Sequence, residues 1–176
     1  MKMIKLKLKR EYVAICVVVL SIFAFFIFGM YSGTRIESYQ SKNDEESQIV
    51  ELLIRFQKAK NNYHLENYLS CLSDTGRFMF AGTVMVAKQE LTELLPSFWA
   101  NLKSNRLNAV PSSREELNGN YFDGAFYDPV IEINKDKASA VLIFMTPVTK
   151  WKTTLFLNFQ KDNEGWKITR LEWDMG

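Results

Sequence analysis

The stretch "GWKITRLEWD", residues 165–174, decides how the sheet of this protein is built. Successive side chains of a strand point to opposite faces, yet the apolar residues here change face midway. The two pairs that fall on opposite faces are Trp166 with Ile168 and Leu171 with Trp173. Either a β-bulge between Ile168 and Leu171 returns them to one face, or both faces are buried. Residues 150–160 are also apolar on one face and mixed on the other, so we expect two-sided use.

The residues before this stretch are predicted to form further strands, and helices are predicted before those strands. The other long strands are expected at residues 120–133, 138–147 and 150–160, and a short one at 77–82. The turns between the long strands contain Asn, Asp or Gly and are typical of antiparallel hairpins. Apolar residues spaced by three and four predict amphipathic helices upstream. These helices are residues 48–59, 65–72 and 87–103, with Pro96 as a kink or restart and Asn43 or Asp44 as the first N-cap.

This order of elements predicts an α+β domain in which N-terminal helices pack on one face of a curved antiparallel sheet. The chain has 176 residues, 47% of them hydrophobic, which is enough for one domain with a packed core and an additional segment.

The additional segment is "YVAICVVVLSIFAFFIFGMY", residues 12–31, which carries no charged side chain. Twenty residues in a helix span about 30 Å, the thickness of a bilayer's hydrocarbon core. Residues 1–12 hold five basic side chains and one acidic one, which favours a cytoplasmic N-terminus. A cleaved signal peptide is the alternative, although its apolar stretch is usually about 7 to 15 residues. We therefore expect a transmembrane anchor rather than a signal peptide.

The charge of the remaining chain argues against one class of partner. Residues 13–176 hold 17 basic and 19 acidic side chains, a net charge of −2. A slightly acidic domain without a basic run is poorly suited to neutralise phosphates, so nucleic acid is not an expected partner. The expected location is the bacterial inner (cytoplasmic) membrane, with the domain periplasmic or extracellular. The expected divisions are a basic cytoplasmic tail (1–11), the anchor (12–31), a linker (32–46) and the extracytoplasmic domain (47–176).

Residues 46–174 resemble the NTF2-like superfamily, also called SnoaL-like and described as cystatin-like in fold. The resemblance rests on the order and spacing of three stretches: "IVELLIRFQKAKNNYHLENYLSCLSDTGRF", "KQELTELLPSFW" and "KTTLFLNFQKDNEGWKITRLEWD". It implies a cone in which the sheet wraps around a pocket and a long helix covers it. A short tail, an anchor and such a domain are also similar in architecture to VirB8-type components of type IV secretion systems. The superfamily includes isomerases, dehydratases and non-catalytic scaffolds, so the fold alone does not give the function.

Candidate catalytic residues are Asp123, Asp128 and Tyr127, in "YFDGAFYDP". The resemblance implies that an Asp and a Tyr in a dry pocket can move a proton next to a carbonyl, as in ketosteroid-isomerase-like enzymes. Both acids also stand in ordinary turn sequences, "FDG" and "YDP", and we favour this reading. Candidate residues at the pocket are Trp99, Tyr121, Arg170 and Glu172. Candidate interface residues are Trp151, Leu155, Phe156 and Trp173.

Metal and nucleophile chemistry find little support in the sequence. His64 is the single histidine and falls at the start of a predicted helix, where we expect a surface or cap residue. Cys71 is expected as a small buried side chain. A zinc site or another cofactor is therefore not expected.

Two functions remain open from the sequence. The first is a membrane-anchored, non-catalytic module that binds a protein partner or forms a homodimer. The second is a pocket for an apolar small molecule, either a binding protein or a lyase or isomerase of the SnoaL or ketosteroid-isomerase kind.

Overall fold

The computed structural model describes residues 33–81, 84–108, 124–146 and 152–174 of the chain. The chain divides into two compact units, residues 1–33 and 34–176, and every element below belongs to the second. Residues 12–31, the expected anchor, lie outside the described residues. Within the described part of the chain, no helix is both long and apolar enough to cross a membrane.

The described residues of the second unit form four helical elements. They are the 3₁₀ helix η1 (Ile36–Ser38) and the α-helices α2 (Asp44–Asn61), α3 (Leu65–Ser70) and α4 (Lys88–Asn108). The three predicted α-helices are confirmed, and α4 continues through Pro96. The predicted cap is confirmed at Asn43, whose side chain accepts a hydrogen bond from the backbone N–H of Glu46 at 2.9 Å.

The sheet has six strands in the order β2-β1-β6-β5-β4-β3. They are β1 (Leu72–Phe80), β2 (Val84–Ala87), β3 (Ala125–Asn134), β4 (Lys137–Met145), β5 (Lys152–Asp162) and β6 (Gly165–Asp174). The expectation of an antiparallel sheet is wrong, because β1 pairs parallel to β6. Turn residues reveal only pairing between consecutive strands, and these two strands are separated in the chain by α4 and four strands. β6 thus lies inside the sheet and joins β1–β2 to the β3–β5 meander.

A bulge in β6 resolves the change of face in residues 165–174. On β5, Asn158 and Phe159 are consecutive, but their partners on β6 are Arg170 and Ile168. Thr169 is therefore the extra residue of the bulge, and it restores the phase of the strand. All four apolar side chains face the helices, and Leu171 is 3% exposed. The expected two-sided burial is wrong, because the bulge places the apolar side chains of both halves of β6 on one face.

A second bulge interrupts β3 at Asp128. The register passes from Tyr127 opposite Ile143 to Val130 opposite Val141, so one extra residue lies on β3. Asp128 has a φ of +48°, a conformation that Asp tolerates better than most side chains. Both Tyr127 and Val130 consequently lie on the same face of the sheet.

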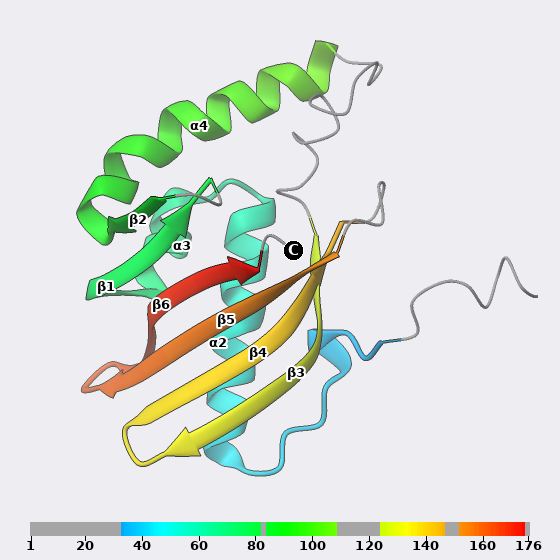
Figure 1. The fold of residues 1–176 in the computed structure, drawn as a ribbon, viewed down its shortest axis with the longest axis vertical. Helices are drawn as coiled ribbons and strands as arrows, with labels where there is room; N and C mark the ends of the chain where they lie inside the picture. Colours follow the sequence, from blue (N-terminus) through cyan, green and yellow to red (C-terminus); the bar gives the residue numbers. More distant parts are fainter. Residues whose placement is uncertain (1–32, 82–83, 109–123, 147–151, 175–176) are drawn as a thin grey trace, which may run out of the picture. The chain divides into compact units, whose positions relative to one another are not determined.

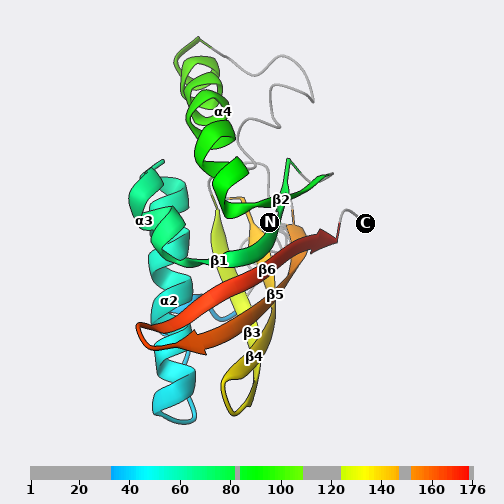
Figure 2. The same ribbon diagram turned by 90° about the vertical axis from the view of Figure 1, so that its left-hand side faces the viewer.

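The core lies between the sheet and α2. The buried side of α2 consists mainly of Ile49, Leu52, Leu53, Phe56, Gln57 and Lys60. Figure 2 shows α2 and α3 on one side of the sheet, whereas Figure 1 looks onto the opposite face with α2 behind it. Helix α4 packs against β1 and β2. Ile36, within the range expected as a linker, is fully buried in this core.

Side chains of α2 cover the free edge of β3 near its start. Gln57 accepts a hydrogen bond from the backbone N–H of Phe126 at 2.6 Å. The Asn61 amide donates to the carbonyl of Gly124 at 2.9 Å and accepts from its N–H at 3.3 Å. Thr34 and Asp128 then exchange two hydrogen bonds, with Asp128 Oδ1 accepting from the N–H of Thr34 at 2.7 Å. The start of this edge, from Gly124 to Asp128, is therefore hydrogen-bonded to side chains of α2 and to the backbone of Thr34, so another strand cannot pair with it there.

The segment before α2 is held by a buried carboxylate, and this makes stability dependent on pH. Glu46 is 2% exposed and accepts hydrogen bonds from the Tyr39 hydroxyl and the backbone N–H of Lys42. Burial raises the pKa of Glu46, but the bonds from Lys42 and Tyr39 outweigh it, so the net pKa is lowered.

A lowered folded-state pKa predicts the direction of the pH dependence. The contribution of Glu46 is present above its unfolded pKa of about 4.3 and is lost as the pH falls through the folded value. We expect Glu46→Gln to be less stable than the wild type at pH 7, with a difference that shrinks below about pH 4. Urea unfolding from pH 3 to 7 measures this, and a difference that stays constant over the range would contradict it.

Candidate functional site

A lysine is buried among aromatic rings at the end of α2. Lys60 is 2% exposed, and its Nζ lies 3.9 Å from the centre of the Phe144 ring. The rings of Trp173 and Phe126 meet Phe144 at centroid distances of 5.4 and 6.1 Å. Gly124 adjoins the same ring, since a Cβ at that position would lie 2.3 Å from it. We call Lys60, Phe126, Phe144 and Trp173 the lysine cluster.

The surroundings of Lys60 decide the charge state of its amine. Burial in a hydrocarbon environment lowers the pKa of Lys60 well below its ordinary value, because the ammonium loses its water. A ring face attracts a cation, but this attraction is smaller than the loss of hydration on full burial. The surroundings of Lys60 therefore favour the neutral form of its amine more than water does.

A row of apolar side chains crosses the face of the sheet opposite α2. Val130 pairs with Val141, and Val141 pairs with Phe156, so the three lie side by side on β3, β4 and β5. Their exposed fractions are 63%, 39% and 43%. Among the described residues, large apolar side chains are exposed at six positions, and this row holds three of them. We call Val130, Val141 and Phe156 the outer strip.

Charged residues flank the outer strip in the neighbouring row. The paired residues of that row are, from β3 to β6, Glu132, Ser139, Asn158 and Arg170. Arg170 also donates to the carboxylate of Glu172, with Nε 2.7 Å from Oε1, and Glu172 pairs with Phe156. The row thus has an acid on β3, at the edge of the sheet, and a base on β6, inside it.

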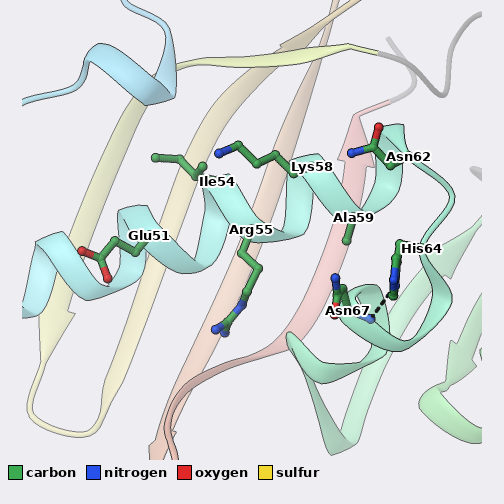
Figure 3. Close-up of a pocket in the computed structure, with 8 residues that line it drawn as sticks. All are labelled: Glu51, Ile54, Arg55, Lys58, Ala59, Asn62, His64 and Asn67. Atoms are coloured by element: carbon green, nitrogen blue, oxygen red, sulfur yellow. Dashed lines mark hydrogen bonds between the residues drawn. The ribbon is translucent and has the colours of Figure 1, made fainter.

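A shallow depression of about 420 Å³ lies on the side of α2 and α3 shown in Figure 3. It is lined by Glu51, Ile54, Arg55, Lys58, Ala59, Asn62, His64 and Asn67. Figure 3 shows Arg55 and Lys58 leaving α2 in opposite directions, so they do not converge on one anion. His64 caps α3, because its Nδ1 accepts from the N–H of Asn67 at 3.4 Å, which confirms the expected role.

The candidate catalytic residues are placed as follows. Asp128 is exposed and bonded to the backbone of Thr34 at the β3 bulge. Tyr127 lies on the outer face, where the Arg35 guanidinium is 5.8 Å from its ring centre. Asp123 lies outside the described residues. The structure therefore does not bring Asp128 and Tyr127 to the lysine cluster.

The candidate pocket residues separate into a core residue and an exposed pair. Trp99 on α4 is 3% exposed and meets the rings of Tyr63 and Tyr68 edge-on. Its indole Nε1 is buried and has no hydrogen-bond partner in the described part of the chain. Arg170 and Glu172 lie on the opposite face of the sheet, beside the outer strip. Tyr121 lies outside the described residues.

The candidate interface residues also fall on different faces. Phe156 belongs to the outer strip, whereas Leu155 is 1% exposed and faces α2 with Trp173. Trp151 lies outside the described residues. Cys71 is fully buried, as expected, and no group of three or more potential metal ligands occurs within the described ranges.

Sequence reasoning missed Lys60, Val130 and Val141. A signal for Lys60 was present, because it stands four residues after Phe56 and continues the apolar side of α2. Val130 was hidden by the β3 bulge, which shifts it to the outer face. No local pattern in the sequence shows that three residues on three strands form one row.

Comparisons with solved structures agree on the fold of this chain, but no comparison assigns the chain to a family. No family model matches the chain, and no curated protein matches it. Among solved structures, a protein of unknown function with a cystatin-like fold from Nostoc punctiforme is 18% identical at a TM-score of 0.54. That similarity covers 78% of this chain and 97% of the other. An NTF2-like protein with a cystatin-like fold from Novosphingobium aromaticivorans is 14% identical at 0.54, covering 73% and 80%.

A third similar structure carries a name that refers to assembly. It is described as a candidate calcium/calmodulin dependent protein kinase II association domain from Xanthomonas campestris. It is 9% identical at a TM-score of 0.53, with 82% of this chain and 95% of the other covered. At such identities the similarity concerns the fold alone. The described part of this chain has the NTF2-like, cystatin-like fold.

Proposed function

We propose that residues 34–176 form a non-catalytic assembly module that pairs with a second copy of itself through the outer strip. We further propose that residues 12–31 anchor it in the inner membrane, with the module on the extracytoplasmic side. The uncharged apolar run and the basic residues before it support the anchor. The observation that carries the assembly function is a row of exposed apolar side chains on a face of the sheet that none of the described helices covers.

Charge complementarity favours a second copy as the partner. A two-fold axis parallel to the strands, between β4 and β5, reverses the order of the strands in the partner sheet. It places Val141 over Phe156 of the other copy, and Glu132 over Arg170 of the other copy. Each contact then occurs twice, which is the property of an isologous interface. The same axis places Val130 over Glu172 of the other copy, so the outer face is complementary to itself in the central Val141–Phe156 contact and in the charges of Glu132 and Arg170.

The fold neighbour described as an association domain is consistent with this proposal. The printed description refers to association of that protein only, and it names no partner for this chain. The VirB8-type architecture noted in the sequence is a further parallel.

Self-association is tested by analytical ultracentrifugation of residues 33–176 and of the full chain in mild detergent. We expect a concentration-dependent dimer for both, and we expect the full chain in the membrane fraction. Phe156→Ser is expected to weaken the dimer at least about 30-fold, because it removes an aromatic side chain from the centre of the interface. Val84→Ser is the matched control, since Val84 is 55% exposed but lies on β2, away from the strip.

Charge exchange tests the arrangement itself. Glu132→Lys and Arg170→Glu are each expected to weaken the dimer, because each places like charges opposite one another. The double variant is expected to recover most of the affinity. In it Lys at position 132 again faces an opposite charge, Glu at position 170 of the other copy. A monomeric wild type, or equal effects of Phe156→Ser and Val84→Ser, would overturn the proposal. Two additive losses in the double variant would exclude this two-fold arrangement.

A further inference from the structure

The depression on the outer side of α2 is a groove between two rows of side chains. One row is Glu51, Arg55 and Ala59, and the other is Ile54, Lys58 and Asn62. Figure 3 shows the two rows leaving α2 on opposite sides, with His64 and Asn67 of the α3 region at one end. Rows of residues four apart are the ridges with which helices pack, and the groove between two ridges receives a ridge of a second helix. We call these two rows the α2 groove.

The α2 groove has charged walls and an apolar floor. Ile54 is half-buried and Ala59 is 4% exposed, so a side chain placed between the rows meets hydrocarbon. Glu51 and Arg55 are four residues apart with the acid first, a spacing that favours an ion pair within one helix. Yet neither of them, nor Lys58, forms a side-chain ion pair or hydrogen bond with another described residue. All three exposed charges are therefore available to another molecule.

The order of charge along α2 favours a second copy of the chain as the occupant. The exposed charged side chains are Asp44 and Glu51 in the first half of the helix, and Arg55 and Lys58 in the second half. An antiparallel copy therefore lays the acidic half of each helix over the basic half of the other. A two-fold axis at the level of residue 53 brings Glu51 beside Arg55 of the other copy, and this pair occurs twice.

We propose that the α2 groove is a second contact between copies of this chain, in which two α2 helices pack antiparallel around a two-fold axis. The groove and the outer strip lie on opposite sides of the sheet, because α2 covers the other face (Figure 2), so both contacts can form at once. Two different two-fold contacts on one chain join dimers into tetramers or longer rows. The inference rests on the assembly function proposed above, but on residues that the outer strip does not contain.

The α2 contact is the weaker of the two contacts. Ion pairs at an exposed position gain little, because water screens the charges and two long side chains lose their freedom. Only the groove floor adds apolar burial. Species larger than a dimer therefore form at higher concentration than the outer-strip dimer does.

Sedimentation velocity of the full chain in mild detergent, over a wide range of concentration, tests the proposal. We expect the wild type to pass from a dimer to larger species. Phe156→Ser weakens the outer strip, so its remaining dimer forms through α2. In that background Arg55→Glu is expected to weaken the dimer at least about tenfold, because it places two acids opposite one another. Arg55→Glu alone is expected to stop at the outer-strip dimer.

A compensating change and a matched control make this test specific. Glu51→Arg added to Arg55→Glu restores opposite charges and is expected to recover the larger species. Lys135→Glu makes a similar change of charge at an exposed residue in the turn between β3 and β4, outside the groove, and is expected to have no effect. Residues 1–33 are the same in all variants, so differences between variants report on the domain.

The outcomes separate the two contacts. If Phe156→Ser stays monomeric at every concentration, or if Arg55→Glu and Lys135→Glu act alike, the proposal is overturned and the groove is left to another protein. An association that Arg55→Glu weakens and Phe156→Ser does not would support the α2 contact and contradict the outer strip.

Discussion

Insertion of one alanine between Arg170 and Leu171 is expected to abolish cooperative folding of residues 34–176. If the bulge at Thr169 is kept, the inserted residue reverses the alternation beyond it, so Leu171 and Trp173 face outwards. If the bulge is lost instead, Arg170 turns towards the core. Exposing a buried Leu costs about 1.5 to 3 kcal/mol, and the exposed Trp or the misplaced charge adds to it. The sum is a large part of a typical stability of about 5 to 15 kcal/mol.

The measurement compares the insertion with the deletion of Thr169. The deletion removes the extra residue, so simple alternation keeps Leu171 and Trp173 on the face of Ile168, and a cooperative unfolding transition is expected to remain. Urea unfolding followed by far-ultraviolet circular dichroism distinguishes the two variants. An insertion variant with an unfolding transition like that of the deletion variant would show that the phase of β6 does not decide which side chains it buries.

Phe144→Ala is expected to destabilise the domain by about 3 to 5 kcal/mol. The side chain is fully buried, and its ring contacts Phe126, Trp173 and the amine of Lys60. Its removal leaves a cavity that the neighbouring rings fill only in part, because they are held by the sheet. Phe144→Leu retains most of the volume and is expected to cost less than half as much.

The sheet supplies a matched control for this substitution. Phe156 is on the adjacent strand β5 but on the outer face, where it is 43% exposed. Phe156→Ala is expected to change the free energy of unfolding of the monomer by less than about 1 kcal/mol. Both values come from urea unfolding of monomeric protein. Similar costs for the two substitutions would contradict the assignment of the two faces.

Local periodicity in the sequence predicts most of the helices and strands of the fold. The helices α2, α3 and α4 and the hairpins from β3 to β6 follow from spacings and turns within about twenty residues of one another. β2 was missed because four residues are too short for a pattern. The first part of β1 is not predicted by its sequence, since "SDTG" at residues 73–76 has the composition of a turn.

What the sequence does not reveal depends on contacts between distant residues. The parallel pairing of β1 with β6 is not predicted by any turn sequence, because the two strands are far apart in the chain. The bulge at Thr169 was one of two alternatives, and choosing between them requires the partner strand, where Asn158 and Phe159 oppose Arg170 and Ile168. The outer strip and the lysine cluster are likewise assembled from several elements. Periodicity suggests which side of an element is buried, but not what lies against it.

The place of β6 in the strand order has a consequence for the speed of folding. β1 and β2 are made early, yet β1 gains its second neighbour only when residues 165–174 are present. Closing a loop of this length before any contact rewards it is slow, so the domain belongs among folds of high contact order. During synthesis, one edge of β1 and one edge of β5 stay without a partner until β6 arrives. During this interval the unpaired edges of β1 and β5 can pair with wrong strands. A chaperone that covers these edges would therefore be most useful before β6 is made.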